Sequence, residues 1–312
     1  MKPIMSRRIL TPIMALVMMF SLAMGIGVVS PASVSAVSID CSTSATPAAG
    51  ASPAAKTSVA SPAAAASAVA FPSGGGELTV FAAASLTDAF NQIAKDLEAA
   101  NPGLKITYNF AGSQALVSQL TQGATADVFA SAGKKQMDAA IAAGVIDGKP
   151  VNFTQNRLAI VVPKDNPAGI NTYRDLAKSG VKLVLAAPAV PVGGYAVQSI
   201  CAAGKDDQTY GATFVSKVAK NIVSQEDDVK AVLAMVQTGE ADAGITYTTD
   251  VSAAVAKDVT LIPIPAPVNV IAKYPIAAAK GGNAALASAF IAYINSDAGQ
   301  ATLKTYGFEP KP

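Results

Sequence analysis

Residues 78–90 constrain the fold of this chain more than any other segment. They begin as an apolar strand, turn at a run of alanines and continue as a helix with one apolar face. That face is predicted to carry Leu86, Phe90, Ile93 and Leu97. The first N–H groups of such a helix have no partner inside it, and the positive end of its dipole points outward. Ser85 lies at this turn, so the segment predicts an anion site, unless the serine is only an N-cap.

A second unit of the same kind follows directly. Apolar and polar residues alternate over 104–110, which predicts a strand, and a small-residue turn then leads into a short helix at Ser113. Adjacent strand–helix units pair in a parallel sheet, and ligands of open α/β sheets bind at the carboxyl edge. We therefore expect Ser85 and Ser113 to lie near each other at that edge.

The composition restricts the possible functions. The chain has 312 residues, of which 51% are hydrophobic and 14% charged, with a net charge of +2. This is enough for two lobes with their own cores and too little positive charge for a nucleic-acid-binding protein. The sequence contains no histidine and only two cysteines. The usual general base and the usual ligands of zinc are therefore missing, and no cofactor is expected.

The N-terminus has the pattern of an export signal. Basic residues within the first eight positions precede an apolar run at 9–29, and a plausible cleavage site ends at Ala36. Residues 1–36 are therefore predicted to direct export to the periplasm or to the outer face of the cytoplasmic membrane. The apolar run is also long enough to remain as a membrane anchor, which is the alternative.

Residues 37–76 are rich in Ala, Ser, Pro, Thr and Gly and predict a flexible tether. Cys41 follows Asp40, whereas lipid attachment would need a small residue at that position. Because the chain is exported, Cys41 and Cys201 either form a disulfide or remain two free thiols. The sequence leaves both possibilities open.

The rest of the chain continues the α/β pattern. Strands are predicted at residues 126–130, 157–163, 182–187, 221–224 and 243–247, and the chain is expected to return to the first lobe near residues 269–279. Helices are predicted at residues 134–143, 173–178, 195–203, 226–238, 283–295 and 297–306. The helix start at 226–228 is a third, weaker anion candidate. We expect two α/β lobes, the first from residues 77–157 and 269–312 and the second from 158–268, with a ligand cleft between them.

An ordered set of motifs resembles the periplasmic molybdate-binding protein family (ModA), the substrate-binding component of ABC-type molybdate importers. The matching segments are residues 79–86, 110–113, 126–132, 190–193, 227–229, 245–247 with Asp250, 274–275 and 306–308. The resemblance covers the chain from about residue 77 to 308. It implies a two-lobed periplasmic-binding-protein fold of type II with its ligand between the lobes.

The resemblance also implies five ligand-binding residues. Ser85 and Ser113 match serines that hold the oxyanion through hydroxyl and backbone N–H groups. Val192 and Val229 match positions that donate a backbone N–H, and Tyr247 matches a tyrosine whose hydroxyl closes the site. These residues would contact the oxygens of molybdate and would not ligate the metal directly.

The chain departs from the family pattern at three positions. Gly112 and Gln114 stand where some relatives have further serines, and Val192 replaces a smaller residue. Val192 would act through its backbone, so its side chain affects the size of the cavity and not the presence of the donor.

The chemistry of a tetraoxoanion agrees with these residues. A dianion of this kind offers only acceptors, and a selective site for it needs only donors. Molybdate, tungstate and sulfate share this pattern, so cavity size must distinguish them. We expect molybdate with tungstate, delivery to an ABC permease, no nucleic acid and a monomer, with another oxyanion such as sulfate as the alternative.

An enzyme is the alternative from another class. Ser131 and Lys134 fit the Ser-x-x-Lys pattern of secreted acyl enzymes, and residues 178–180 and 293–295 resemble their other two motifs. Those two motifs occur in the wrong order. The sequence therefore favours a binding protein without catalytic residues.

Overall fold

The computed structural model describes residues 37–42 and 69–311, which belong to one compact unit from Ala36 to Pro312. The predicted export signal at 1–36 and most of the predicted tether lie outside the described residues. None of the described helices has the length and apolar character needed to cross a membrane.

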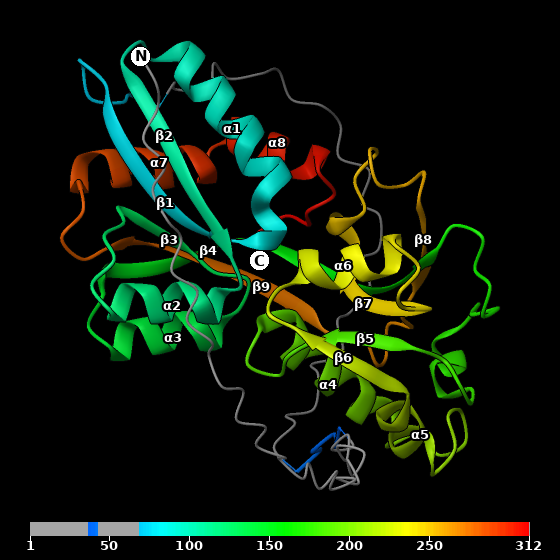
Figure 1. The fold of residues 1–312 in the computed structure, drawn as a ribbon. Helices are drawn as coiled ribbons and strands as arrows, with labels where there is room; N and C mark the ends of the chain where they lie inside the picture. The colour runs from blue at the N-terminus through cyan, green and yellow to red at the C-terminus, as the bar shows by residue number, and fades with distance from the viewer. Residues whose placement is uncertain (1–36, 43–68, 312) are drawn as a thin grey trace, which may run out of the picture. The chain divides into compact units, whose positions relative to one another are not determined.

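Lobe 1 is built on the first strands of the chain and on strand β9 near its end (Figure 1). Its sheet has the order β2-β1-β3-β9-β4. Its strands are β1 (Gly76–Ala83), β2 (Leu104–Ala111), β3 (Val128–Ala130), β9 (Ile271–Ala279) and the first part of β4 (Ile146–Pro163). Its helices are η1 (Ala84–Leu86), α1 (Thr87–Ala100), α2 (Ser113–Thr121), α3 (Lys134–Ala142), α7 (Ala284–Asn295) and α8 (Asp297–Thr305).

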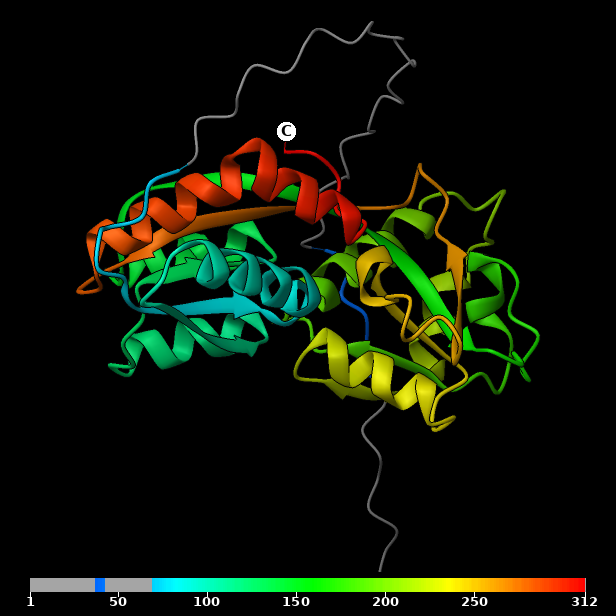
Figure 2. The same cartoon turned by 90° about the horizontal axis from the view of Figure 1, so that it is seen from above.

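Strands β1 and β2 are parallel, as predicted, and their last residues Ala83 and Ala111 lie opposite each other. The two serine turns therefore emerge side by side at one edge of the sheet. Helices cover both faces of this sheet, with α7 and α8 on one side and α2 and α3 on the other (Figure 2).

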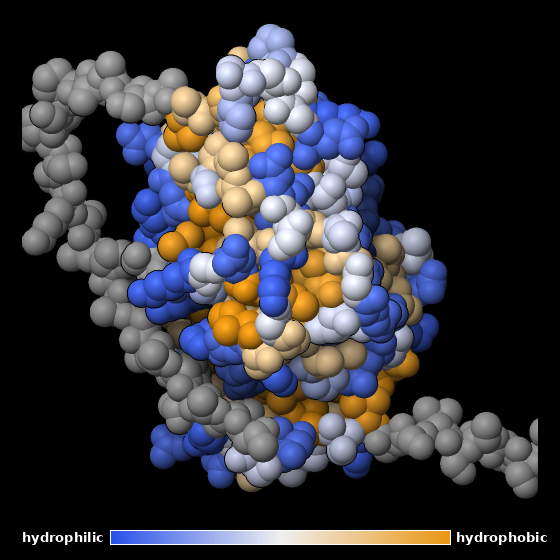
Figure 3. Space-filling model, turned by 90° about the vertical axis from the view of Figure 1, so that its left-hand side faces the viewer, coloured by the Kyte–Doolittle hydropathy of each residue, from blue (hydrophilic) through white to orange (hydrophobic). Residues whose placement is uncertain are grey.

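Each face of the lobe 1 sheet has its own apolar core. Phe90 of α1 is fully buried, and its ring centroid lies 5.8 Å from that of Phe290 and 6.0 Å from that of Phe153. Phe129 and Met137 belong to the separate core under α2 and α3. The surface of the lobe 1 end mixes hydrophobic and hydrophilic side chains (Figure 3).

Lobe 2 continues from the second part of β4, which pairs with β7 and β8. Its other strands are β5 (Leu183–Ala186), β6 (Ile222–Glu226), β7 (Ala243–Tyr247) and β8 (Val259–Pro263). Its helices are η2 (Tyr173–Ala177), α4 (Pro191–Ala203), α5 (Phe214–Asn221), α6 (Val229–Gln237) and η3 (Thr248–Asp250). Strand β4 thus runs through both lobes, and the two-lobed α/β fold follows from this shared strand. The lobe boundaries after residues 157 and 268 stay a prediction.

Several elements differ from the sequence-based expectation. Strand β4 begins at Ile146, although the strand was predicted only from residue 157. The first part of β4 contains Gly148 and Pro150 and has an irregular register, so its sequence does not show the strand pattern. Helix α5 and strand β8 were not predicted, and η2 is a 3-10 helix. Helix α4 starts at Pro191, before the predicted start at residue 195, because proline suits the first turn of a helix.

Cys41 and Cys201 form a disulfide, which resolves the alternative that the sequence left open. The bond attaches residues 37–42 to helix α4, and Val37 and Ile39 pack against the core. This short part of the expected tether is therefore held on lobe 2.

Candidate functional site

A small cavity lies where the ends of β1 and β2 in lobe 1 meet the starts of α4 and α6 in lobe 2. The centre of a water-sized sphere can reach only about 10 Å³ of it, far less than in the pocket of a typical organic ligand. All five predicted site residues are in its lining. The lining consists of Ala83, Ala84, Ser85, Ala111, Gly112, Ser113, Ala132, Val190, Pro191, Val192, Asp228, Val229 and Tyr247.

Ser85 occupies the 3-10 turn η1 between β1 and α1, and its side chain is not the cap of either helix. The reading of Ser85 as a simple N-cap is therefore wrong. Its hydroxyl lies 2.9 Å from the hydroxyl of Tyr274. Asn156 donates to that tyrosine oxygen over 3.4 Å. Either hydroxyl can donate in the Ser85–Tyr274 bond, and when Tyr274 donates, the Ser85 proton is free for a group in the cavity.

Ser113 is the first residue of α2, and its side chain is 1% exposed. Its hydroxyl oxygen accepts the N–H of Ala132 over 3.1 Å, which fixes the oxygen and leaves the proton free to donate. Gly112 precedes it and lies close to the loop before α6. A Cβ atom at Gly112 would lie 2.4 Å from the carbonyl oxygen of Asp227, so a side chain would not fit there.

Two helix starts of lobe 2 face the cavity. Val192 is the second residue of α4, after Pro191 at the N1 position. Val229 is the first residue of α6, and the N-cap Asp228 accepts the N–H groups of the next two residues, Lys230 and Ala231. The N–H of Val229 has no carbonyl partner within its own helix. Both valines are buried, and their side chains have no polar atoms. Each can therefore act as a donor only through its backbone N–H.

Tyr247 ends strand β7 and is 1% exposed. Its hydroxyl is buried and has no hydrogen-bond partner among the described residues. Burial raises the pKa of this phenol well above its ordinary value, so it keeps its proton. A buried phenol without a partner is costly, and it marks a donor available to a ligand.

Two glutamines of lobe 1 bind the loops that lead into the lobe 2 helices. Gln114 donates to the carbonyl oxygen of Asp227 over 2.8 Å, and Gln136 donates to that of Ala189 over 2.8 Å. These bonds hold the starts of α6 and α4 against the cavity. Gln114, expected only as a departure from the family pattern, thus contacts the opposite lobe.

The cavity lining contains no lysine or arginine among the described residues. It does contain Asp228, although the sequence predicted a lining of donors without an acceptor. One oxygen of Asp228 accepts the two N–H groups of its cap, which offsets its charge locally. Hydroxyls and helix-start N–H groups therefore supply the polar lining. Such neutral donors suit a small anion.

The described residues hold no cluster of three or more His, Cys, Asp or Glu side chains that could bind a metal ion. The Ser-x-x-Lys alternative also lacks its geometry. Ser131 forms its hydrogen bonds with Gly133, and the ammonium of Lys134 pairs with Asp138 on the exposed side of α3. The two side chains are thus engaged elsewhere.

Sequence reasoning missed a set of buried residues behind the serines. Tyr274 and Asn156 lie on β9 and β4, and both are 0% exposed. Asp250 is also fully buried, and burial raises its pKa to about 6. Tyr274 and Asp250 belong to the matching motifs, but nothing in the sequence indicated which groups they would contact.

Comparisons with known proteins agree with the fold and show the family. The family model for bacterial extracellular solute-binding proteins matches residues 78–309. The chain is 41% identical to the molybdate-binding protein ModA of Mycobacterium tuberculosis H37Rv over 236 residues, which cover 75% of this chain and 85% of that protein.

Two solved structures share the fold. The periplasmic molybdate-binding protein of Azotobacter vinelandii has a TM-score of 0.63 and 19% identity, over 75% of this chain and all of that chain (100%). The sulfate-binding protein SubI of Mycobacterium tuberculosis has a TM-score of 0.67 and 17% identity, over 75% of this chain and 86% of that chain. At these identities the likeness concerns the fold alone.

Proposed function

The chain belongs to the ModA family of bacterial extracellular solute-binding proteins, and we propose that it captures molybdate outside the cytoplasmic membrane and delivers it to an ABC importer. Tungstate, which has the same charge and donor requirement, is expected to bind as well. The protein acts as a monomeric receptor without a cofactor, and its partner is the membrane permease.

One observation carries this proposal. Two serines, two helix starts and one unpartnered phenol, all named from the sequence, line a single small cavity. A tetraoxoanion needs several donors converging from different directions, and these five positions come from both lobes. In the proposed complex Ser85, Ser113 and Tyr247 donate through hydroxyls, and Val192 and Val229 donate through backbone N–H groups.

The donor set also supports an anion over a cation or a neutral organic ligand. A cation would need oxygen acceptors, of which the lining offers one carboxylate that is already bound to a helix start. A neutral organic ligand would need more apolar volume than this cavity encloses.

The test is calorimetric titration of residues 37–312, which include both cysteines, with molybdate, tungstate, sulfate and phosphate in parallel. We expect tight binding of molybdate and tungstate, and at least a hundredfold weaker binding of the other two. If sulfate binds as tightly as molybdate, the receptor is one for smaller oxyanions. If none of the four binds, the oxyanion proposal is wrong.

A further inference from the structure

We propose that Lys230 is a positioning residue of this site, whose ammonium group holds the two lobes closed over the bound anion by pairing with Asp88. The inference rests on the proposed function and deepens it. Lys230 itself does not line the cavity. It would therefore act on the ligand through the elements that it joins.

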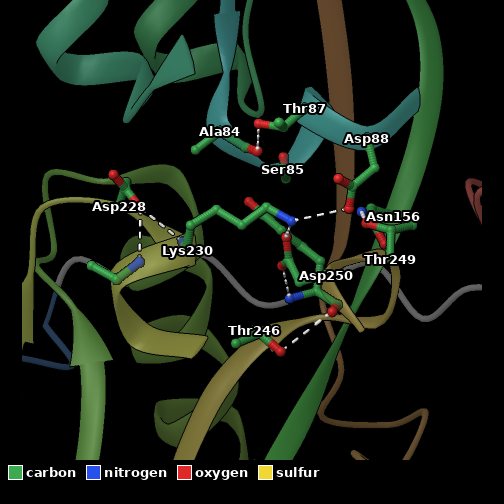
Figure 4. A network of polar contacts seen from close by, with 12 residues as sticks. Ala84, Ser85, Thr87, Asp88, Asn156, Asp228, Lys230, Thr246, Thr249 and Asp250 are labelled. Atoms are coloured by element: carbon green, nitrogen blue, oxygen red, sulfur yellow. Dashed lines mark hydrogen bonds and ion pairs between the residues drawn. The ribbon is translucent and has the colours of Figure 1, made fainter. Parts of the chain in front are cut away.

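The ammonium lies between carboxylates from two elements (Figure 4). Its Nζ atom is 3.3 Å from Oδ2 of Asp88 on α1 and 3.9 Å from Oδ1 of Asp250 in η3. Among the ion pairs of the described residues, Lys230–Asp88 is the one that joins a helix of lobe 1 to a helix of lobe 2. The side chains of Lys230 and Asp88 are 31% and 39% exposed, so water screens the pair only in part.

Each partner of Lys230 is close in sequence to a predicted ligand position. Lys230 follows Val229 directly, and Asp88 comes three residues after Ser85 in the first turn of α1. Asp250 accepts the backbone N–H of Tyr247 through its other oxygen over 2.9 Å. The ion pair thus fixes the distance between three elements that present donors to the cavity.

The local charges explain why a cation is needed here. Asp228 lies in the cavity lining, and Asp88 and Asp250 both face the ammonium of Lys230 beside it. Asp88 and Asp228 both raise the pKa of Asp250, so the three carboxylates act on one another. These negative charges would destabilise a dianion bound in the closed cleft. Lys230 offsets these charges from outside the cavity. A cation inside the cavity would bind any anion, whatever its shape.

The pair should act mainly on ligand release. It joins opposite lobes, so it exists only when the cleft is closed, and it stabilises the closed complex over the open one. Ligand entry occurs in the open state, in which the lysine is separate from Asp88. Loss of the pair is therefore expected to raise the dissociation rate constant and to leave the association rate constant nearly unchanged.

The experiment compares Lys230→Gln, Asp88→Asn, the double variant and Lys230→Arg in residues 37–312. Stopped-flow tyrosine fluorescence with molybdate gives both rate constants. We expect each single neutral variant to raise the dissociation rate constant about three- to tenfold, and the double variant to add no more. Lys230→Arg should restore it to within twofold of wild type. Lys105→Gln is the matched control, because Lys105 pairs with Glu77 inside lobe 1 over 3.7 Å.

The outcomes separate this inference from the proposed function. Wild-type protein that fails to bind molybdate overturns both. Wild-type protein that binds, together with neutral variants that release molybdate at the wild-type rate, overturns only the role of Lys230. Effects of the two single variants that multiply in the double variant would also overturn the pairing. If Lys230→Gln fails to fold, Asp88→Asn applies the same test from the other lobe.

Discussion

Lobe 1 lines the cavity with two serine side chains, whereas lobe 2 lines it with the first turns of two helices and one phenol. The serine hydroxyls depend on residue type, and their oxygens are fixed by Tyr274 and by the N–H of Ala132. The helix starts depend only on backbone direction, which many residue types can provide. The hydroxyl donors, which include Tyr247 of lobe 2, therefore depend on residue type, whereas the two helix starts of lobe 2 do not.

The difference extends to how the donors are held. Neutral groups hold the serines of lobe 1. Charged groups contribute to holding two donors of lobe 2, since Asp228 caps α6 and Asp250 accepts the N–H of Tyr247. The stability of lobe 2 should therefore depend on pH, whereas the contribution of lobe 1 to affinity should depend on its serine hydroxyls.

The largest expected effect comes from removing both hydroxyls of lobe 1. A hydrogen bond to a charged group contributes about 1.5–3 kcal/mol. The double variant Ser85→Ala with Ser113→Ala should therefore weaken molybdate binding by at least about a hundredfold, measured by calorimetric titration.

Ser131→Ala is the matched control for the serines, since Ser131 is equally buried but bonds within its own turn to Gly133. Its affinity should stay within about twofold of wild type. Thermal unfolding without ligand separates a binding effect from the loss of the Ala132 contact. Wild-type affinity in the double variant would show that lobe 1 does not donate through hydroxyls. Loss of molybdate affinity in Ser131→Ala, with wild-type affinity in the double variant, would contradict the proposed roles of Ser85 and Ser113 and return attention to the acyl-enzyme alternative.

The second prediction concerns pH and the buried carboxylate of lobe 2. Burial raises the pKa of Asp250 from 3.8 to about 6, and Asp88 and Asp228 add to the rise, whereas Lys230 opposes it. Between pH 3.8 and about 6, Asp250 is therefore protonated in the folded protein and ionised in the unfolded chain. The free energy of unfolding should fall as pH rises through this window, by up to about 3 kcal/mol.

Urea unfolding at several values between pH 4 and 7 measures this effect. Asp250→Asn cannot titrate, so its stability relative to wild type should increase across the window and become constant above it. Parallel stability curves for the two proteins would show that Asp250 has the same pKa in the folded and unfolded states.

The third prediction tests the backbone donor of lobe 2. Proline suits the first position of a helix but lacks the N–H, and Asp228 already has an extended backbone that tolerates a following proline. Val229→Pro should weaken molybdate binding about 10- to 100-fold. Val229→Ala, which keeps the N–H and shortens the side chain, should change it by less than about threefold. Equal losses in the two variants would mean that the side chain and not the N–H matters.

The contrast between the lobes also explains how much of the molecule the sequence could predict. The alternation of β2 and the apolar face of α1 identified two strand–helix units, and their parallel pairing followed. Both serines could be placed at the sheet edge because each occupies a small-residue turn between a strand and a helix. Val192 and Val229 were accessible only through the family resemblance, since a valine at a helix start is ordinarily a core residue.

Other features were beyond the sequence for physical reasons. The start of β4 is hidden by Gly148 and Pro150, residues that ordinarily interrupt strands. Asn156 and Tyr274 meet only because two distant strands pair antiparallel, with Asn156 opposite Ala272. The roles of Lys230 and Asp88 depend on a contact across 142 positions of the chain, which no local pattern can reveal.

The last prediction compares two buried tyrosines, whose ring centroids lie 5.8 Å apart. The hydroxyl of Tyr247 has no partner among the described residues, whereas that of Tyr274 lies against Ser85. Tyr247→Phe removes a proposed direct donor and should weaken molybdate binding about tenfold. It also removes a buried group without a partner, so the ligand-free protein should be as stable as wild type or slightly more stable.

Tyr274→Phe should have the smaller effect on affinity, about threefold, because it removes only the group that orients Ser85. Asn156 keeps its bond to Thr249 over 2.7 Å in that variant, and only its longer bond to the Tyr274 hydroxyl, over 3.4 Å, is lost. Calorimetric titration and thermal unfolding of both variants give the two comparisons. A greater loss of affinity at Tyr274 than at Tyr247 would reverse the assignment, making Tyr274 the donor and Tyr247 a packing residue of lobe 2.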